Sequence, residues 1–208
     1  MFFQAGINRI ISLKEPSTSP PYFVIIADIF GDSVALQRFA HELGQPFSII
    51  SPYSEPVSFQ DEAHAYQYFM QHVGLHQYAK QIEQQLQSQT SPVCVIAFSV
   101  GASAMWLLSD QLTENTHSNI TQVHCFYSAQ IRHYLSLAPK LPLRFIFPEQ
   151  ELHFNIDSVI QQLEKKTNVE VVKTPWRHGF MNALSINFSD EGYKCYLNQL
   201  KNHGFKKV

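Results

Sequence analysis

The sequence has few cysteines and few charged residues, and each shortage excludes a class of protein. Its three cysteines, at positions 94, 125 and 195, are widely separated, so neither a disulfide framework nor a cysteine-based zinc site is expected. Charged residues make up only 15% of the 208 residues, and the net charge of −2 leaves no basic surplus. We therefore expect neither nucleic acid nor an anionic membrane surface as a partner.

Long apolar runs and glycine-rich loops are also missing. No run of apolar residues approaches the roughly 18 needed for a membrane span, and the N-terminus lacks the pattern of a signal peptide. The eight glycines form no phosphate-binding motif. His72 and His76 are four residues apart, but Gly74 lies between them and no acidic partner is near, so no metal site is expected. We expect a cytoplasmic protein with reduced cysteines.

Hydrophobic residues are plentiful, at 45% of the chain, and they include 16 Phe and 9 Tyr. This composition and length predict one globular domain over residues 1–208. Within it, residues 1–13 are moderately apolar and predict a short strand or hairpin. Residues 14–21 contain three prolines and predict a linker.

Strand-like and helix-like segments alternate along the chain. Short runs rich in β-branched and aromatic residues predict strands at 22–26, 47–50, 93–98, 120–127, 143–147 and 169–173. Helical spacing predicts helices at 34–43, 61–90 (divided at Gly74), 101–112, 156–166 and 191–201. The alternation is typical of an α/β fold with a mostly parallel sheet and helices on both faces.

A serine follows the most strand-like run of the chain directly. Ser99 lies between Ala97 and Gly101, and small residues at both positions are what a sharp strand-to-helix turn requires. This is the G-x-S-x-G nucleophile elbow, with alanine at the first small position. Such a turn exposes the serine hydroxyl and directs the first backbone N–H groups of the next helix at an oxyanion. An ordinary helix capped by Ser99 would give the same pattern.

A histidine at the expected place follows the last predicted strand. Enzymes with a nucleophile elbow carry the acid and then the histidine after the serine in the chain. His178 stands in a glycine-containing loop after residues 169–173, and we expect it to accept the serine proton. His124, His133 and His153 are the rivals closest to the other candidate residues, but none of them follows the last strand.

The acid of such a triad should follow the strand before the last one. Glu149 and Glu151 both lie just after residues 143–147. We favour Glu151, because a loop can turn its side chain toward His178, while Glu149 remains an alternative. Asp157 also remains one, although it is expected to cap the next helix.

The loop after the first predicted strand is the expected source of a second oxyanion donor. Its sequence predicts the backbone N–H of Ile29 or of Phe30 for this role, beside the N–H of Val100 after the nucleophile. A plain turn with a solvated Asp28 is the alternative.

These segments resemble the dienelactone hydrolase family of α/β-hydrolases. The resemblance runs from about Tyr22 to the last helix, and the H-G-F segment is its most specific part. The segments that carry it are Ala27-Asp28-Ile29-Phe30-Gly31, Phe98-Ser99-Val100-Gly101, Phe126-Tyr127-Ser128, Glu149-Gln150-Glu151 and His178-Gly179-Phe180.

The resemblance implies the α/β-hydrolase fold without a large lid domain, and a role for each matched residue. Ser99, Glu151 and His178 take the positions of nucleophile, acid and base, and Ile29 and Val100 take those of the oxyanion amides. Asp28 takes the place of the glutamate that pairs with the resting nucleophile in the cysteine enzymes of the family. The substrate pocket is expected at Asp28, Phe30 and Tyr127.

Two departures from the family limit what the resemblance implies about the substrate. The founding members use cysteine where this chain has Ser99, and their arginines for a substrate carboxylate have no evident match. We therefore expect a serine hydrolase that cleaves a small ester, lactone or thioester through an acyl-enzyme, without cofactor or metal. Acyl transfer to another acceptor, or a binding protein that kept the fold without efficient catalysis, are the alternatives. The oligomeric state is left open.

Overall fold

The computed structural model describes residues 22–202, apart from the side chains of Asn115 and His117. Its six strands form one sheet in the order β2-β1-β3-β4-β5-β6, in which all five pairings are parallel. The strands are β1 (Tyr22–Ile26), β2 (Phe47–Ile50), β3 (Val93–Phe98), β4 (Ile120–Phe126), β5 (Leu143–Phe147) and β6 (Val169–Lys173). The prediction of a parallel sheet is confirmed. The strand or hairpin predicted at 1–13 and the linker predicted at 14–21 lie outside the described residues.

Successive side chains of the central strands enter two separate hydrophobic cores. Val24 and Ile26 of β1 belong to one core, whereas Phe23 and Ile25 belong to the other. This alternation follows from the two-residue period of a strand, whose neighbouring side chains point to opposite faces. Because both faces are buried, the central strands consist of continuous apolar runs rather than of alternating apolar and polar residues.

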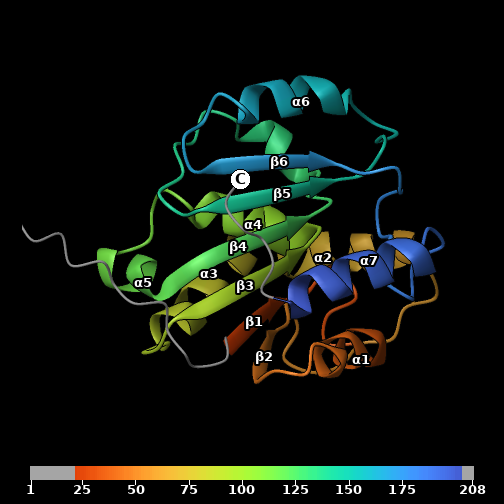
Figure 1. Ribbon diagram of the computed structural model, residues 1–208. Coiled ribbons are helices and arrows are strands. Elements are labelled where there is room, and N and C mark those ends of the chain that lie inside the picture. Colours follow the sequence, from red (N-terminus) through yellow and green to blue (C-terminus); the bar gives the residue numbers. More distant parts are fainter. Residues whose placement is uncertain (1–21, 203–208) are drawn as a thin grey trace, which may run out of the picture.

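Helices cover both faces of the sheet, as predicted (Figure 1). Helices α1 (Val34–Glu42) and α7 (Asp190–Lys201) pack on one core. The other core is covered by α2 (Glu62–His72), α3 (Gly74–Gln87), α4 (Val100–Leu108) and α6 (Ile156–Leu163). Two further elements were not predicted, α5 (Glu114–Asn119) and the 3-10 helix η1 (Gln130–His133). Both are too short for an apolar period to be visible in the sequence.

Local hydrogen bonds and backbone conformation determine where several helices begin and end. The Ser33 hydroxyl accepts from the backbone N–H of Leu36 and so caps α1. Gly74, at a φ of +70°, separates α2 from α3 as predicted. The prediction that Asp157 caps the following helix is wrong, because the Asn155 side chain accepts the first free N–H groups of α6. Asp157 lies in the first turn instead and pairs with Lys173.

The carboxyl ends of all six strands lie at one edge of the sheet, because every pairing is parallel. The segments that leave this edge after β1, β3, β4, β5 and β6 carry every residue predicted for the site. Among the helices of residues 22–202, none is long and apolar enough to cross a membrane. Cys94, Cys125 and Cys195 are free thiols.

Candidate active site

Ser99 lies on a strained turn between β3 and α4. Its φ of 48° and ψ of −110° place it in a backbone region that residues other than glycine rarely adopt. The turn is held by its backbone N–H, which donates to the Phe126 carbonyl at 2.9 Å. A Cβ on Gly101 would lie 2.5 Å from the Ala27 carbonyl oxygen. The small residue at this position is therefore required by the close approach of α4 to the segment after β1.

Ser99, His178 and Glu151 form a continuous hydrogen-bonded chain. The Oγ of Ser99 is 3.1 Å from Nε2 of His178, and Nδ1 of the same ring is 2.7 Å from Oε1 of Glu151. The His178 side chain is 33% exposed and that of Glu151 is 12% exposed. In this arrangement the carboxylate can hold the imidazole in the tautomer whose Nε2 accepts the hydroxyl proton. Three loops that leave different strands thus bring the three residues together.

The alternative acids make other contacts. The Glu149 side chain is exposed, and its backbone N–H donates to the Trp176 carbonyl at 2.7 Å. Asp157, on α6, pairs with Lys173 of β6, with 2.5 Å between Oδ1 and Nζ. Of the three carboxylates left open by the sequence, Glu151 is the one at hydrogen-bond distance from His178.

The loop that carries His178 is fixed by packing and by a side-chain hydrogen bond. Gly179 has a φ of +86°, and a Cβ there would collide with the Ser185 hydroxyl. The Asn187 side-chain amide donates to the His178 carbonyl at 3.0 Å. The imidazole also packs against the ring of Tyr127, with 5.0 Å between the ring centroids. These contacts hold the imidazole next to Ser99.

The loop after β1 distinguishes between the two predicted oxyanion donors. The backbone N–H of Phe30 donates to Oδ1 of Asp28 at 2.9 Å and is therefore committed. The Ile29 carbonyl, which belongs to the same peptide group as the Phe30 N–H, accepts from the Tyr53 hydroxyl at 2.8 Å. Both ends of that peptide group are therefore held. Ile29 is thus the candidate donor of the two. Val100 is the first residue of α4, so its N–H has no acceptor within the helix.

Asp28 is buried, so the alternative of a plain turn with a solvated Asp28 is wrong. Its Oδ1 accepts from the Phe30 backbone, and its Oδ2 accepts from the Asn182 side-chain amide at 2.6 Å. Burial raises the pKa of this carboxyl, while the two hydrogen bonds and the nearby His178 act in the opposite direction. The carboxyl joins the loop after β1 to the loop that follows His178.

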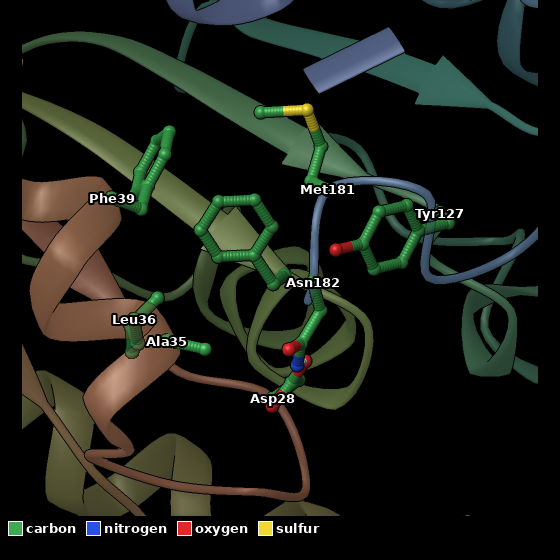
Figure 2. Close-up of a pocket in the computed structure, with 8 residues that line it drawn as sticks. Asp28, Ala35, Leu36, Phe39, Tyr127, Met181 and Asn182 are labelled. Atoms are coloured by element: carbon green, nitrogen blue, oxygen red, sulfur yellow. Dashed lines mark hydrogen bonds between the residues drawn. The ribbon is translucent and has the colours of Figure 1, made fainter. Parts of the chain in front are cut away.

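A small pocket lies beside these residues, between α1 and the loops after β4 and β6 (Figure 2). It encloses about 250 Å³ of empty space, part of it open to solvent. Its lining residues are Asp28, Ala35, Leu36, Phe39, Phe98, Tyr127, Met181 and Asn182. Asp28 and Tyr127 were predicted for the pocket. Phe30, also predicted, is not among the lining residues, because its ring packs against Phe59.

Sequence reasoning missed the apolar wall of this pocket. Leu36 is partly buried and Phe39 is buried on α1, and helical spacing gives the same pattern for a core residue and a pocket residue. Met181 and Asn182 follow His178 closely in the sequence. Their nearness to the histidine was the one signal that could have suggested them.

The chain matches no protein-family model, and no curated protein matches its sequence significantly. Solved structures do match it. A YdeN-like hydrolase from Pectobacterium atrosepticum is 16% identical with a TM-score of 0.55, covering 88% of this chain and 92% of that one. Mouse alpha/beta hydrolase domain-containing protein 10 is 11% identical with a TM-score of 0.59, covering 90% of each chain. A monoacylglycerol lipase from Paleococcus ferrophilus is 8% identical with a TM-score of 0.58, covering 88% of this chain and 95% of that one.

The chain has the α/β-hydrolase fold. At these low identities, the likeness to the solved structures establishes the fold and leaves the chemistry to be argued from the residues. In this α/β-hydrolase fold the connection from β2 to β3 carries α2 and α3, which pack on the sheet. No large lid domain is present within residues 22–202.

No cation lines the pocket of this α/β-hydrolase fold, as far as the described residues go. Arg177 is exposed in the loop before His178. The other arginines of residues 22–202 contact groups elsewhere: Arg38 pairs with Glu42, Arg132 lies over the Phe154 ring, and Arg144 pairs with Glu170. In residues 22–202, no three His, Cys, Asp or Glu side chains are grouped as metal ligands.

Proposed function

We propose that this protein is a serine hydrolase that cleaves a small carboxylic ester, lactone or thioester through an acyl-enzyme. The observation that carries the proposal is the chain of two hydrogen bonds from Ser99 through His178 to Glu151. The strained turn at Ser99 supports it, since strain of this kind persists where a function requires it. The fold supports it as well, because one of the similar structures is a monoacylglycerol lipase.

In the proposed mechanism His178 relays one proton in the acylation step and a second proton in the deacylation step. Nε2 of the imidazole accepts the Ser99 proton while Oγ attacks the carbonyl carbon, and Glu151 stabilises the imidazolium that forms. The oxyanion accepts hydrogen bonds from the backbone N–H groups of Val100 and Ile29. The imidazolium then protonates the leaving alcohol or thiol, and the acyl group stays on Oγ. A water molecule, deprotonated by the same nitrogen, then attacks the acyl-enzyme. The imidazolium returns this proton to Oγ as the C–Oγ bond breaks, which releases the acid and regenerates Ser99.

We further propose a dienelactone hydrolase-like subtype, on the five sequence segments given above. The serine in place of cysteine changes the role of Asp28. This carboxyl accepts hydrogen bonds from Phe30 and Asn182, so we assign it to holding the oxyanion loop against the loop after His178. A cytoplasmic location and a single domain over residues 1–208 remain proposals from composition.

The test is hydrolysis of p-nitrophenyl esters from acetate to octanoate by the wild-type protein and by Ser99→Ala. We expect the variant to lose about 10⁴-fold or more in kcat/KM. Ser158→Ala is the matched control, because this serine is exposed on α6 and its removal should change the rate by less than about twofold. A fluorophosphonate should label the wild-type protein once, at Ser99, as shown by mass spectrometry.

If the wild-type protein hydrolyses none of these esters faster than Ser99→Ala and is not labelled, the proposal is wrong. The fold would then serve a binding protein. If labelling occurs and the acyl group passes to an added alcohol or amine in preference to water, acyl transfer replaces hydrolysis as the function.

A further inference from the structure

Tyr127 has a backbone conformation that a large aromatic residue rarely adopts. It follows β4 directly and has a φ of 40°. Among the described residues other than glycine, Ser99 is the only other one with a positive φ. The Tyr127 backbone N–H donates to the Ile146 carbonyl at 2.8 Å, which helps to hold the turn. A strained turn of this kind, next to the candidate nucleophile, points to a function for the side chain that it directs.

The hydroxyl of Tyr127 is buried without a hydrogen-bond partner. The residue is 1% exposed, and its hydroxyl has no partner among the groups that the structure describes. Burial raises the pKa of this phenol well above its usual value, so the hydroxyl stays protonated and can donate a hydrogen bond. Nearly all buried polar side chains of native proteins are paired, and an unpaired one requires an explanation.

The unpaired hydroxyl faces the pocket described above. Tyr127 lines it, and Figure 2 shows the phenolic oxygen pointing inward, toward the side on which Leu36 and Phe39 lie. Two other polar side chains of the lining already have partners, because Asn182 donates to Asp28. The Tyr127 hydroxyl is a buried polar group of the lining for which the described residues supply no partner.

The size and position of the pocket suit one arm of an ester that is bound at Ser99. The pocket is too small to enclose a whole ligand, because part of its space of about 250 Å³ is open solvent. The pocket adjoins the triad, because Phe98 directly precedes Ser99 and the Tyr127 ring packs on His178. The wall contributed by Leu36, Phe39 and Met181 is apolar.

The charge around the pocket selects against an anionic arm. Asp28 lies in the lining, and both Asp28 and Glu62 are close enough to raise the pKa of Tyr127 further. Oε1 of Glu62 also lies 3.7 Å from the place where a Cβ on Gly179 would stand. Since no arginine or lysine lines the pocket, a carboxylate on the substrate would meet like charge without a compensating cation.

We propose that this pocket is a specificity subsite for a compact, uncharged arm of the substrate that carries one oxygen acceptor. The Tyr127 hydroxyl donates a hydrogen bond to that oxygen, and the apolar wall encloses the remaining carbons. The inference rests on the proposed hydrolase function and adds the class of substrate: short esters or lactones with an ether, hydroxyl or carbonyl oxygen near the reacting carbonyl.

The experiment uses pairs of esters that differ by one oxygen in place of one methylene group. In the acyl arm the pair is p-nitrophenyl methoxyacetate and p-nitrophenyl butanoate. In the alcohol arm it is 2-methoxyethyl acetate and butyl acetate. Each pair is hydrolysed by the wild-type protein and by Tyr127→Phe, which removes the hydroxyl alone. For each pair we take the kcat/KM of the oxygen-bearing ester divided by that of its alkyl partner. Dividing this value for the wild type by the value for the variant gives a double ratio, in which the intrinsic reactivity of the esters cancels.

We expect Tyr127→Phe to lose about tenfold more in kcat/KM on the oxygen-bearing ester of one pair than on its alkyl partner. The pair that responds identifies the arm that the pocket binds. The matched control is Tyr196→Phe, a buried tyrosine of α7 that packs in the same aromatic cluster but does not line the pocket. Its double ratio should stay near one.

A double ratio within about twofold of one in both pairs overturns the inference. So does a lower thermal midpoint of Tyr127→Phe, because removal of an unpaired hydroxyl should leave the stability unchanged or raise it. Binding separates this inference from the proposed function. On the Ser99→Ala protein, ligand-detected NMR should show tighter binding of one oxygen-bearing ester, lost when Tyr127→Phe is added. If that preference is found without any hydrolysis by the wild type, the subsite stands and the proposed function fails.

Discussion

His178 and His124 show how differently two parts of the same sheet treat one kind of side chain. His178 stands in a loop at the carboxyl edge, partly exposed, between the Ser99 hydroxyl and the Glu151 carboxylate. His124 lies within β4, is 3% exposed and has Arg144 as its partner in the register with β5. Burial and the Arg144 cation lower the pKa of His124 to about 3, so it stays neutral at physiological pH.

The comparison teaches that position in the sheet decides what a histidine can do. Within a strand the backbone is committed to the sheet, and side chains are packed on both faces, so a buried imidazole is held without access to a substrate. At the carboxyl edge the chain leaves the sheet, and loops from several strands can direct polar side chains at one point. Three predictions test how far this difference extends.

The largest expected effect separates the two histidines by activity. His178→Asn should reduce kcat/KM for p-nitrophenyl acetate by about 10⁴-fold, because no base then accepts the Ser99 proton. His124→Asn should keep kcat/KM within about threefold of the wild type, since His124 is buried beside Ile96, three residues before Ser99 along the chain. Circular dichroism checks that both variants are folded. Equal losses in the two folded variants would contradict the comparison.

A smaller effect is expected for the carboxylates at the same edge. Glu151→Gln should reduce kcat/KM by about 10³-fold, because an amide can donate to Nδ1 and favour the wrong tautomer of His178. Glu149→Gln is the matched control, as the same substitution two residues away on an exposed side chain. It should change kcat/KM by less than about twofold. A larger loss in Glu149→Gln than in Glu151→Gln would reverse the assignment of the acid.

The smallest expected effect is on stability at low pH, and it tests whether His124 in the sheet stays neutral. With a folded pKa of about 3 against an ordinary value of 6.5, His124 binds a proton only in the unfolded state between these limits. The free energy of unfolding should therefore fall as the pH drops through that window, by at most about 1.4 kcal/mol per pH unit for this one group. Between pH 7 and pH 5 the loss is about 2 kcal/mol.

Urea unfolding of the wild type and of His124→Asn at both pH values measures this loss. The difference between the two proteins cancels the contributions of Asp28 and of the other carboxyls. The variant should lack about 2 kcal/mol of the wild-type dependence on pH. The same pH dependence in both proteins would mean that His124 takes up its proton over the same pH range in the folded and unfolded states.

Local sequence patterns were sufficient to predict the sheet and two residues of the candidate triad. Strands β1 and β3 are apolar runs that are buried on both faces, and such runs are visible in the sequence without any knowledge of their neighbours. Ser99 was predicted by the small residues around it, since the turn crowds the backbone within five consecutive positions. His178 was predicted by its place after the last strand. Chain order fixes which edge of a parallel sheet a loop reaches.

Only the tertiary structure decided which groups meet at that edge. Glu149, Glu151 and Asp157 all follow β5 closely, and loop geometry alone brings Glu151 to His178. The choice of Ile29 over Phe30 depends on a hydrogen bond within the loop after β1. The pocket joins α1 to residues more than a hundred positions later. Such contacts arise from the packing of segments that are far apart in the sequence. The hydrophobic period of each segment predicts its own helix or strand, but it does not show which distant segment it will contact.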